Sequence, residues 1–170
     1  MKLKLKEITL FSLLGTVLFV SKVLMEFLPN IHLLSVLIAL FTAVFGVKAI
    51  YPVLVYILLN GVYAGFSLWW VPYIYIWPIL WAVLLLVKEN TESKKKVVLY
   101  TVITTLHGLL FGVLYAPMQA LMFGFGFKQT VAWVVAGLAF DAIHAASNLI
   151  LCLIILPFAP LFRKVVQKIY

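Results

Sequence analysis

Residues 130–162 read TVAWVVAGLAFDAIHAASNLILCLIILPFAPLF, and this stretch decides the fold. It is long enough to cross a bilayer, because a spanning helix needs about 20 mostly apolar residues. Within it, Asp141, His144 and Asn148 are spaced three and four residues apart. On a helix these polar side chains share one face. Polar and ionisable groups inside a membrane span need partners and mark functional sites.

The composition of the whole chain indicates a membrane protein. Of its 170 residues, 66% are hydrophobic and 11% are charged, and the mean hydropathy is +1.19. A soluble domain averages about 45–50% apolar and about 25% charged residues. Because the candidate spans use nearly the whole chain, we expect residues 1–170 to form a single integral membrane domain. The six candidate spans are residues 8–28, 33–45, 50–67, 69–87, 97–122 and 130–162.

Charge placement predicts the orientation of these spans. Four basic segments, residues 1–7, Lys48, residues 88–96 and residues 163–168, fall on one side of six spans, whereas Lys128 falls on the other. Positively charged loops face the cytoplasm. We therefore predict an all-α polytopic membrane protein, a bundle of six transmembrane helices with both termini in the cytoplasm. The net charge of +8 follows from this topology, and such short juxtamembrane groups argue against nucleic-acid binding.

The chemistry of an enzyme is not apparent in the sequence. Cys152 is the only cysteine, which excludes an intrachain disulfide and a cysteine metal cluster. The sequence contains no Walker-type glycine loop, no H-E-x-x-H and no G-x-S-x-G. Asp141 and His144 alone make a weak metal site, because structural sites use four ligands. We expect no cofactor and no catalysis; an intramembrane enzyme using these two residues and a non-transporting membrane scaffold are the alternatives.

Polar residues from several spans are predicted to meet in the outer half of the bundle. Their depths follow from alternating helix directions and a rise of about 1.5 Å per residue. This arrangement predicts a pocket that opens to the exterior. The converging residues come from non-adjacent segments: Glu26, His32, Asn60, His107, Tyr115, Gln119, Asp141, His144 and Asn148.

Each polar group also has a purely structural explanation, in which it is satisfied by a neighbour. These pairings are Asp141 with His144, Asn148 with a nearby backbone group, His107 with Asn60, and Lys22 with Glu26 one turn away. Glycines four residues apart, such as Gly108 and Gly112, have a packing explanation as well. Small side chains let helix backbones approach closely in lipid, either within this bundle or against another subunit.

Aromatic residues crowd the start of the fourth span, residues 69–81. Trp and Tyr gather at membrane interfaces, because one part of the ring system is apolar and one edge is wet. Tyr73 and Trp77 continue deeper than such a belt. Side chains of this kind stack on flat ligands and attract cationic ones.

Five stretches carry a resemblance to a known family. They are PNIHLLSVL (29–37), FGVKAIYPVLVYILLNGVYAGF (45–66), LWWVPYIYIWPILW (68–81), AGLAFDAIHAASN (136–148) and PFAPLFRKV (157–165). Together with a basic start, six spans, short loops and a basic end, the chain resembles the substrate-binding S components of energy-coupling factor (ECF) transporters. These proteins import vitamins and related micronutrients. The resemblance covers the whole chain and is most specific in the last span.

The resemblance implies a prokaryotic plasma-membrane subunit that binds one small vitamin-like substrate near the outer face. The implied pocket is built from the outer halves of the last three helices and from the loops after helices 1, 3 and 5. The implied partners are the lipid bilayer, an ECF transmembrane coupling subunit and two ATPase subunits, and the S component topples in the membrane to release its cargo. Docking in the family uses an A-x-x-x-A surface on helix 1, for which Ser12 and Thr16, with Gly15 between them, are the nearest equivalent.

These considerations give a set of predicted substrate contacts. Tyr73 and Trp77 are expected to stack on the ligand, and the remaining residues are expected to recognise its polar or charged groups. The full set is Tyr73, Trp77, His107, Tyr115, Gln119, Asp141, His144 and Asn148.

Overall fold

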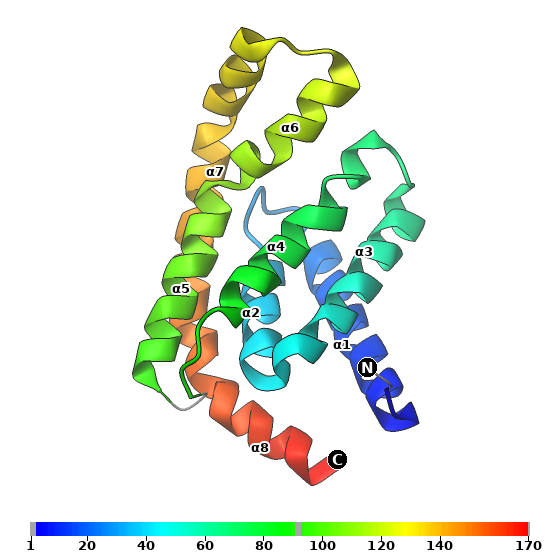
Figure 1. The fold of residues 1–170 in the computed structure, drawn as a ribbon, viewed down its shortest axis with the longest axis vertical. Helices are drawn as coiled ribbons and strands as arrows, with labels where there is room; N and C mark the ends of the chain where they lie inside the picture. The colour runs from blue at the N-terminus through cyan, green and yellow to red at the C-terminus, as the bar shows by residue number, and fades with distance from the viewer. Residues whose placement is uncertain (1–2, 91–92, 170) are drawn as a thin grey trace.

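The computed structural model describes residues 3–90 and 93–169, which form helices and connecting turns only (Figure 1). Lys2 and residues 91–92, which belong to two of the basic segments, lie outside the described residues. The α-helices are α1 (Leu5–Leu24), α2 (Leu34–Phe45), α3 (Ile50–Ala64), α4 (Tyr73–Leu85), α5 (Lys94–Leu109), α6 (Phe111–Phe123), α7 (Phe127–Ile155) and α8 (Ala159–Ile169). Short 3-10 helices connect some of them: η1 (Gly46–Ala49), η2 (Leu68–Trp70) and η3 (Leu156–Phe158).

Five helical stretches in the described chain are long and apolar enough to cross a membrane. Three of these stretches join two α-helices each: α2 with α3, α5 with α6, and α7 with α8. The prediction of an all-α protein is confirmed, and its helices are compatible with a membrane bundle. The five stretches are residues 5–24, 34–64, 68–85, 94–123 and 127–168.

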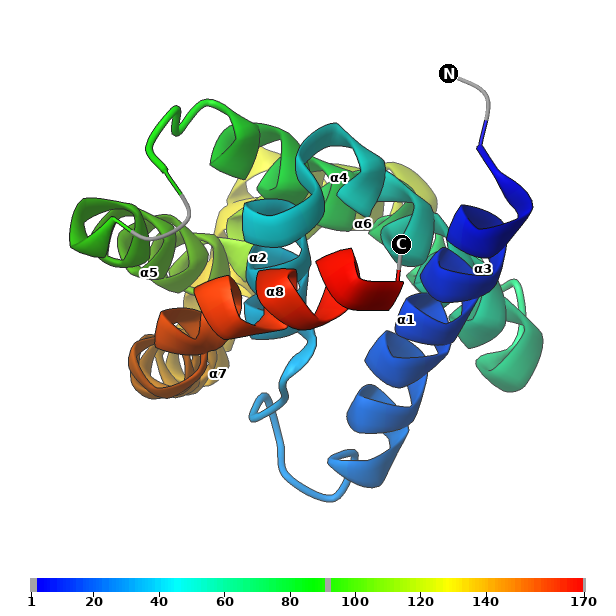
Figure 2. The same cartoon turned by 90° about the horizontal axis from the view of Figure 1, so that it is seen from below.

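Helix α2 lies at the centre of the bundle (Figure 2). Most of its residues are buried, including Val36, Ile38 and Ala39 at 0% exposure. A helix that is apolar all round belongs in such a position. Its 12 residues span only about 18 Å at about 1.5 Å per residue. It ends at Gly46, whose φ of +56° lies in the region that favours glycine, and there the chain turns into α3.

The predicted fifth helix, residues 97–122, is wrong as a single continuous element. It is divided at Leu110 into α5 and α6, which leave the break in different directions (Figure 1). The backbone amide of Gly112 donates to the Asp141 carboxylate of α7 at 3.0 Å. A carboxylate at a helix N-terminus is favoured by the free amides and the helix dipole. This contact between α6 and α7, which are far apart in the sequence, therefore stabilises the beginning of a second helix after the break.

The last predicted helix, residues 130–162, also differs from the structure. Helix α7 begins at Phe127 and ends at Ile155, after which η3 leads into the separate helix α8. Pro157 lies in η3, and proline both lacks an amide proton and clashes with the preceding helical turn. Figure 2 shows α8 lying across the lower end of the bundle beneath α2.

Close backbone approaches hold the long helices together. A Cβ added at Gly108 of α5 would lie 2.7 Å from Asn148 Nδ2 and 3.2 Å from the Ala145 backbone nitrogen of α7. A Cβ added at Gly15 of α1 would lie 2.5 Å from the Val55 side chain of α3. Gly108 and Gly112 thus pack against α7 inside this chain, as their packing explanation predicted, and Gly15, predicted as a docking residue, packs against α3.

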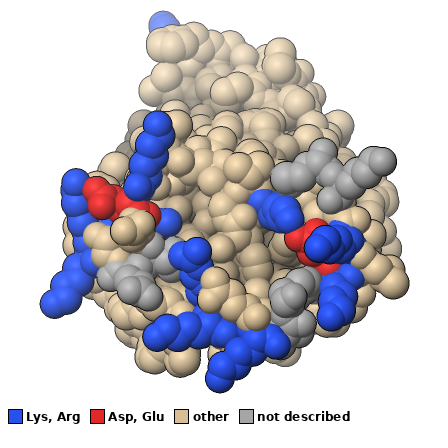
Figure 3. Space-filling model, turned by 60° about the horizontal axis from the view of Figure 1, so that its bottom comes forward, with Lys and Arg blue, Asp and Glu red and all other residues tan. Residues whose placement is uncertain are grey.

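Lysine and arginine side chains gather at the lower end of the molecule, where α8 and both termini lie (Figure 3). Two acidic residues accompany them, since Glu7 pairs with Lys48 and Glu89 pairs with Lys95. Lys128 lies in the first turn of α7, at the opposite end of that helix. The fold therefore separates most of its positive charge from the end that carries the α6–α7 connection.

Candidate binding cavity

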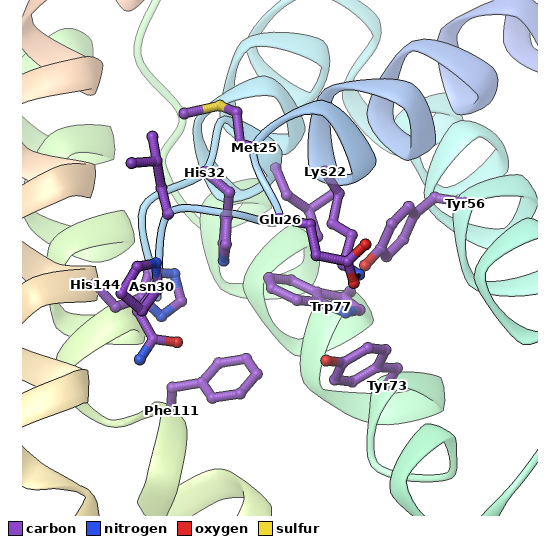
Figure 4. Close-up of a pocket in the computed structure, with 13 residues that line it drawn as sticks. Lys22, Met25, Glu26, Asn30, His32, Tyr56, Tyr73, Trp77, Phe111 and His144 are labelled. Atoms are coloured by element: carbon purple, nitrogen blue, oxygen red, sulfur yellow. Dashed lines mark hydrogen bonds and ion pairs between the residues drawn. The ribbon is translucent and has the colours of Figure 1, made fainter. Parts of the chain in front are cut away.

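A cavity of about 190 Å³ lies between the α1–α2 connection and the helices α3, α4, α6 and α7 (Figure 4). A single buried water needs only about 10–15 Å³ by a comparable measure. The space is therefore large enough for a small organic molecule. Its walls come from five separate parts of the chain: Lys22, Met25, Glu26, Leu28, Pro29, Asn30, His32, Leu34, Tyr56, Tyr73, Trp77, Phe111 and His144.

Trp77 forms the centre of the aromatic wall. It is 2% exposed, and its ring centroid lies 5.5 Å from that of Phe111, 5.8 Å from Tyr73 and 6.1 Å from Tyr56. Its indole nitrogen Nε1 has no hydrogen-bond partner among the described residues. Leaving a buried donor unpaired costs about 1–3 kcal/mol. The wall therefore offers a rigid aromatic surface together with an unused donor.

Two histidines form the opposite side of the cavity. His144 Nε2 and the Ser35 hydroxyl lie 3.2 Å apart, and the His144 ring centroid lies 4.7 Å from that of His32. His32 belongs to the α1–α2 connection, and its Nδ1 has no partner among the described residues. Burial, helped by the nearby charge of Lys22, lowers the pKa of His32 to about 4. The ring is therefore neutral at physiological pH and can donate or accept one hydrogen bond.

The charged residues of the lining form one ion pair. Lys22 Nζ lies 2.7 Å from Glu26 Oε1, which confirms the predicted pairing. Figure 4 shows both side chains directed toward Tyr56, Tyr73 and Trp77. The pair has opposite charges, so the lysine and the carboxylate of the lining balance each other.

Asp141 bonds to the start of α6 and lies outside the lining of this cavity. It is 6% exposed, does not line the cavity, and accepts the hydrogen bond from the Gly112 amide. It is not paired with His144, whose Nε2 contacts Ser35. The shared helix face is real, but the two side chains serve different neighbours: Asp141 holds the start of α6, and His144 contributes to the cavity.

His107 and Asn148 are used between helices. His107 Nε2 lies 3.1 Å from the Ile76 carbonyl of α4, and Asn148 Nδ2 donates to the Thr104 carbonyl of α5 at 3.0 Å. The expected bond from His107 to Asn60 is absent among these contacts; both amide atoms of Asn60 lack a partner in the described chain. His107 lies behind the aromatic wall, with its ring centroid 5.7 Å from that of Trp77.

Tyr115 and Gln119 lie on α6, outside the cavity lining. The Tyr115 hydroxyl donates to the Trp69 carbonyl at 2.6 Å, and its ring stacks on Trp133 at 5.9 Å. Gln119 is half-buried. The structure thus brings Tyr73, Trp77 and His144 together at the cavity, and it places five predicted contacts elsewhere: His107, Tyr115, Gln119, Asp141 and Asn148.

Several lining residues were not among the predicted contacts. Glu26 and His32 were recognised as outer polar groups, and their position beside Pro29 in a helix connection was the available signal. Tyr56 comes one helical turn before Asn60 on α3, so the two side chains share a buried helix face. This spacing was the available signal for Tyr56. Nothing in the sequence indicated that Phe111 would line the cavity, because it reaches the cavity only through the break between α5 and α6.

The predicted docking residues of α1 divide into two sets. Ser12 and Thr16 are exposed, and the Thr16 hydroxyl donates to the Ser12 carbonyl at 3.0 Å. Gly15 is buried against Val55 of α3. Small polar side chains therefore remain on the outer face of α1, whereas Gly15 serves the packing of α1 on α3.

Comparison with known proteins found no match to a family model, a curated protein or a solved structure. Within the described residues, no group of three His, Cys, Asp or Glu side chains is placed to hold a metal ion.

Proposed function

We propose that this protein is a membrane-embedded binding subunit that captures a small vitamin-like solute and delivers it through an ATP-driven ECF transporter complex. The cavity beneath the α1–α2 connection is the observation that supports this most. It combines an aromatic wall, two histidines, of which His32 is neutral, and unused polar atoms in a space suited to a small molecule. Ligand sites characteristically combine an apolar lining with a few convergent polar groups.

The proposal includes six membrane spans with both termini in the cytoplasm. Helices α2 and α3 count as separate spans because the chain turns at Gly46, and α8 lies outside the last span. The gathering of lysine and arginine at the end that carries the termini supports this orientation (Figure 3), because such residues favour the cytoplasmic side. In this orientation the cavity opens toward the outside, the side from which a nutrient arrives.

The lining points to a flat, neutral or zwitterionic solute. Trp77 and Tyr73 offer stacking surfaces, and Trp77 Nε1 offers a donor to a ligand acceptor. A ligand with a single net charge would place an unbalanced charge beside the Lys22–Glu26 pair. A solute with both charges, or with neither, leaves the electrostatic balance of the cavity intact.

Delivery requires a motor that this chain does not supply. Its described residues contain no repeat or nucleotide-binding loop, and its exposed Ser12–Thr16 face is the proposed contact with the coupling subunit. We expect Ser12→Trp combined with Thr16→Trp to abolish co-purification of the coupling subunit and its two ATPases. Leu138→Trp on α7, an exposed position of another helix, is the control and leaves co-purification unchanged. Equal loss in both variants would contradict docking at α1.

Binding itself is tested by thermal unfolding of the detergent-purified protein against a panel of vitamins and heteroaromatic nutrients. A compound that binds only the folded state at about 100 times its Kd adds roughly 2.7 kcal/mol of stability. We expect one compound to raise the unfolding temperature of the wild type and of Asp141→Asn, but not of Trp77→Ala. A shift retained in full by Trp77→Ala would exclude this cavity as the binding site.

A further inference from the structure

The α1–α2 connection contains a tight turn whose central residues are Pro29 and Asn30. The amide of Ile31 donates to the Leu28 carbonyl at 3.3 Å, which closes the turn. Asn30 has a φ of +57°, the single positive value among the described residues other than glycine. Proline is favoured at the first central position of such a turn, and glycine or asparagine at a second position with positive φ. The backbone therefore explains a choice between asparagine and glycine at position 30.

The side chain of Asn30 has a position that the turn alone does not require, because it lines the cavity beneath the α1–α2 connection. Figure 4 shows it on the side of the cavity that holds His144, across from Glu26 and Tyr56. Asn30 is half-buried, and its carboxamide forms no hydrogen bond with any other described residue. Both the donor and the acceptor of this carboxamide are therefore available to a molecule in the cavity.

A carboxamide recognises a particular kind of ring edge. It presents an N–H donor beside a carbonyl acceptor, so it pairs through two parallel hydrogen bonds with an edge that carries an acceptor beside a donor, as asparagine does with adenine. The rest of the lining suits the ring itself. The ring centroid of Phe111 lies 5.5 Å from that of Trp77 and 5.3 Å from that of His144, so aromatic surfaces continue from α4 to α7 through α6.

We propose that Asn30 determines the specificity of this cavity by pairing with such an edge. The solute is then a heteroaromatic compound that carries a hydrogen-bond donor next to an acceptor, as in a cyclic amide or an aminopyrimidine. This inference rests on the proposed function, because it requires that the cavity holds a solute. Trp77 offers a stacking surface to any flat ring, whereas Asn30 distinguishes rings of one shape, since a ring without the donor leaves the Asn30 carbonyl unpaired.

The test is titration calorimetry of the detergent-purified full chain with two probes, 2-pyridone, which is a cyclic amide, and N-methyl-2-pyridone, which lacks the N–H donor. Asn30→Gly removes the carboxamide and keeps a residue suited to the positive φ. Asn90→Gly, the same change at an exposed position between α4 and α5, is the control. We expect the wild type and the control to bind 2-pyridone roughly tenfold to a hundredfold more tightly than its methyl derivative. Asn30→Gly should unfold at the wild-type temperature and bind both probes equally weakly.

Equal affinity of the wild type for the two probes would overturn the inference, and so would a preference for 2-pyridone that Asn30→Gly retains. Should Asn30→Gly fail to fold, Asn30→Ala, which also lacks the carboxamide, takes its place.

If neither probe binds the wild type, native mass spectrometry of the protein from its own membranes decides. A bound molecule with a donor–acceptor ring edge that is lost from Asn30→Gly supports the inference. A bound molecule without such an edge, or one that Asn30→Gly retains, overturns the inference and leaves the proposed function standing. A chain without any bound molecule contradicts both.

Discussion

At the level of single residues, the cavity beneath the α1–α2 connection is lined by side chains that have buried polar atoms without partners in the described chain. Trp77 Nε1 and His32 Nδ1 are buried without partners in the described chain, and both belong to residues that line the cavity. Native proteins pair nearly all such groups. A ligand in this cavity that accepted from Trp77 Nε1 and bonded to His32 Nδ1 would pair both groups.

Variants of Asp141 distinguish a structural role of this residue from a ligand-binding role. Asp141→Ala removes the acceptor of the Gly112 amide, and we expect a loss of about 1–3 kcal/mol in the free energy of unfolding. Asp141→Asn keeps an acceptor oxygen and should lose less. Solute affinity should be unchanged in Asp141→Asn. Chemical unfolding and equilibrium binding measure the two effects, and a large loss of affinity without loss of stability would return Asp141 to the binding site.

His32 makes stability depend on pH. Its pKa falls from its usual 6.5 to about 4 in the fold, so the folded state favours the neutral ring. This contribution is complete above pH 6.5 and is lost as the pH falls toward about 4, for a total of roughly 3 kcal/mol. We expect His32→Gln to flatten the dependence of the unfolding temperature on pH in this window. Identical profiles for variant and wild type would show that His32 is protonated as easily in the fold as outside it.

At the scale of elements, the sequence predicted the existence of the long helices better than their ends. Apolar length was sufficient to locate α1, α3 and α4, because each follows from a local run of residues. The break between α5 and α6 depends on a bond between Gly112 and Asp141, which are 29 residues apart. Local pattern carries no information about such a contact. For the same reason, Phe111 was missed and Asp141 was expected at the cavity.

Two glycines offer a matched test of the contact between α5 and α7. Gly108→Ala would bring a Cβ to 3.2 Å from the Ala145 backbone nitrogen, and overpacking of this kind costs about 1–3 kcal/mol. Gly137→Ala on α7 meets nothing within 4 Å, so it should stabilise the helix by about 0.5–1 kcal/mol. Thermal unfolding of the two variants should therefore shift in opposite directions. A common direction would contradict the close approach of these helices.

At the scale of the whole molecule, charge and cavity occupy different regions. Basic residues could be assigned to one end from the sequence alone, because they follow alternate apolar runs. The cavity could be predicted only as a region, since its walls are contributed by residues 22–34 and by the helices α3, α4, α6 and α7. Three of the eight predicted contacts, Tyr73, Trp77 and His144, lie there. His107, Tyr115, Asp141 and Asn148 instead bond to other parts of the chain.

Single cysteines test the proposed orientation. In a Cys152→Ala background, Lys128→Cys should react with a membrane-impermeant maleimide in intact cells. Lys164→Cys should react only after the cells are permeabilised, because α8 lies at the basic end of the molecule. Both positions are exposed in the fold, so access depends on the side of the membrane. The reverse pattern of labelling would invert the topology and turn the solute cavity toward the cytoplasm.

The proposed function requires that the cavity beneath residues 25–33 holds a small solute. Its most direct test is native mass spectrometry of the intact protein extracted from its own membranes. We predict that the wild type carries a small organic molecule, that Asp141→Asn retains it, and that a variant combining Trp77→Ala with His144→Ala lacks it. A wild-type protein of bare chain mass, or the same bound molecule in the double variant, would contradict the claim.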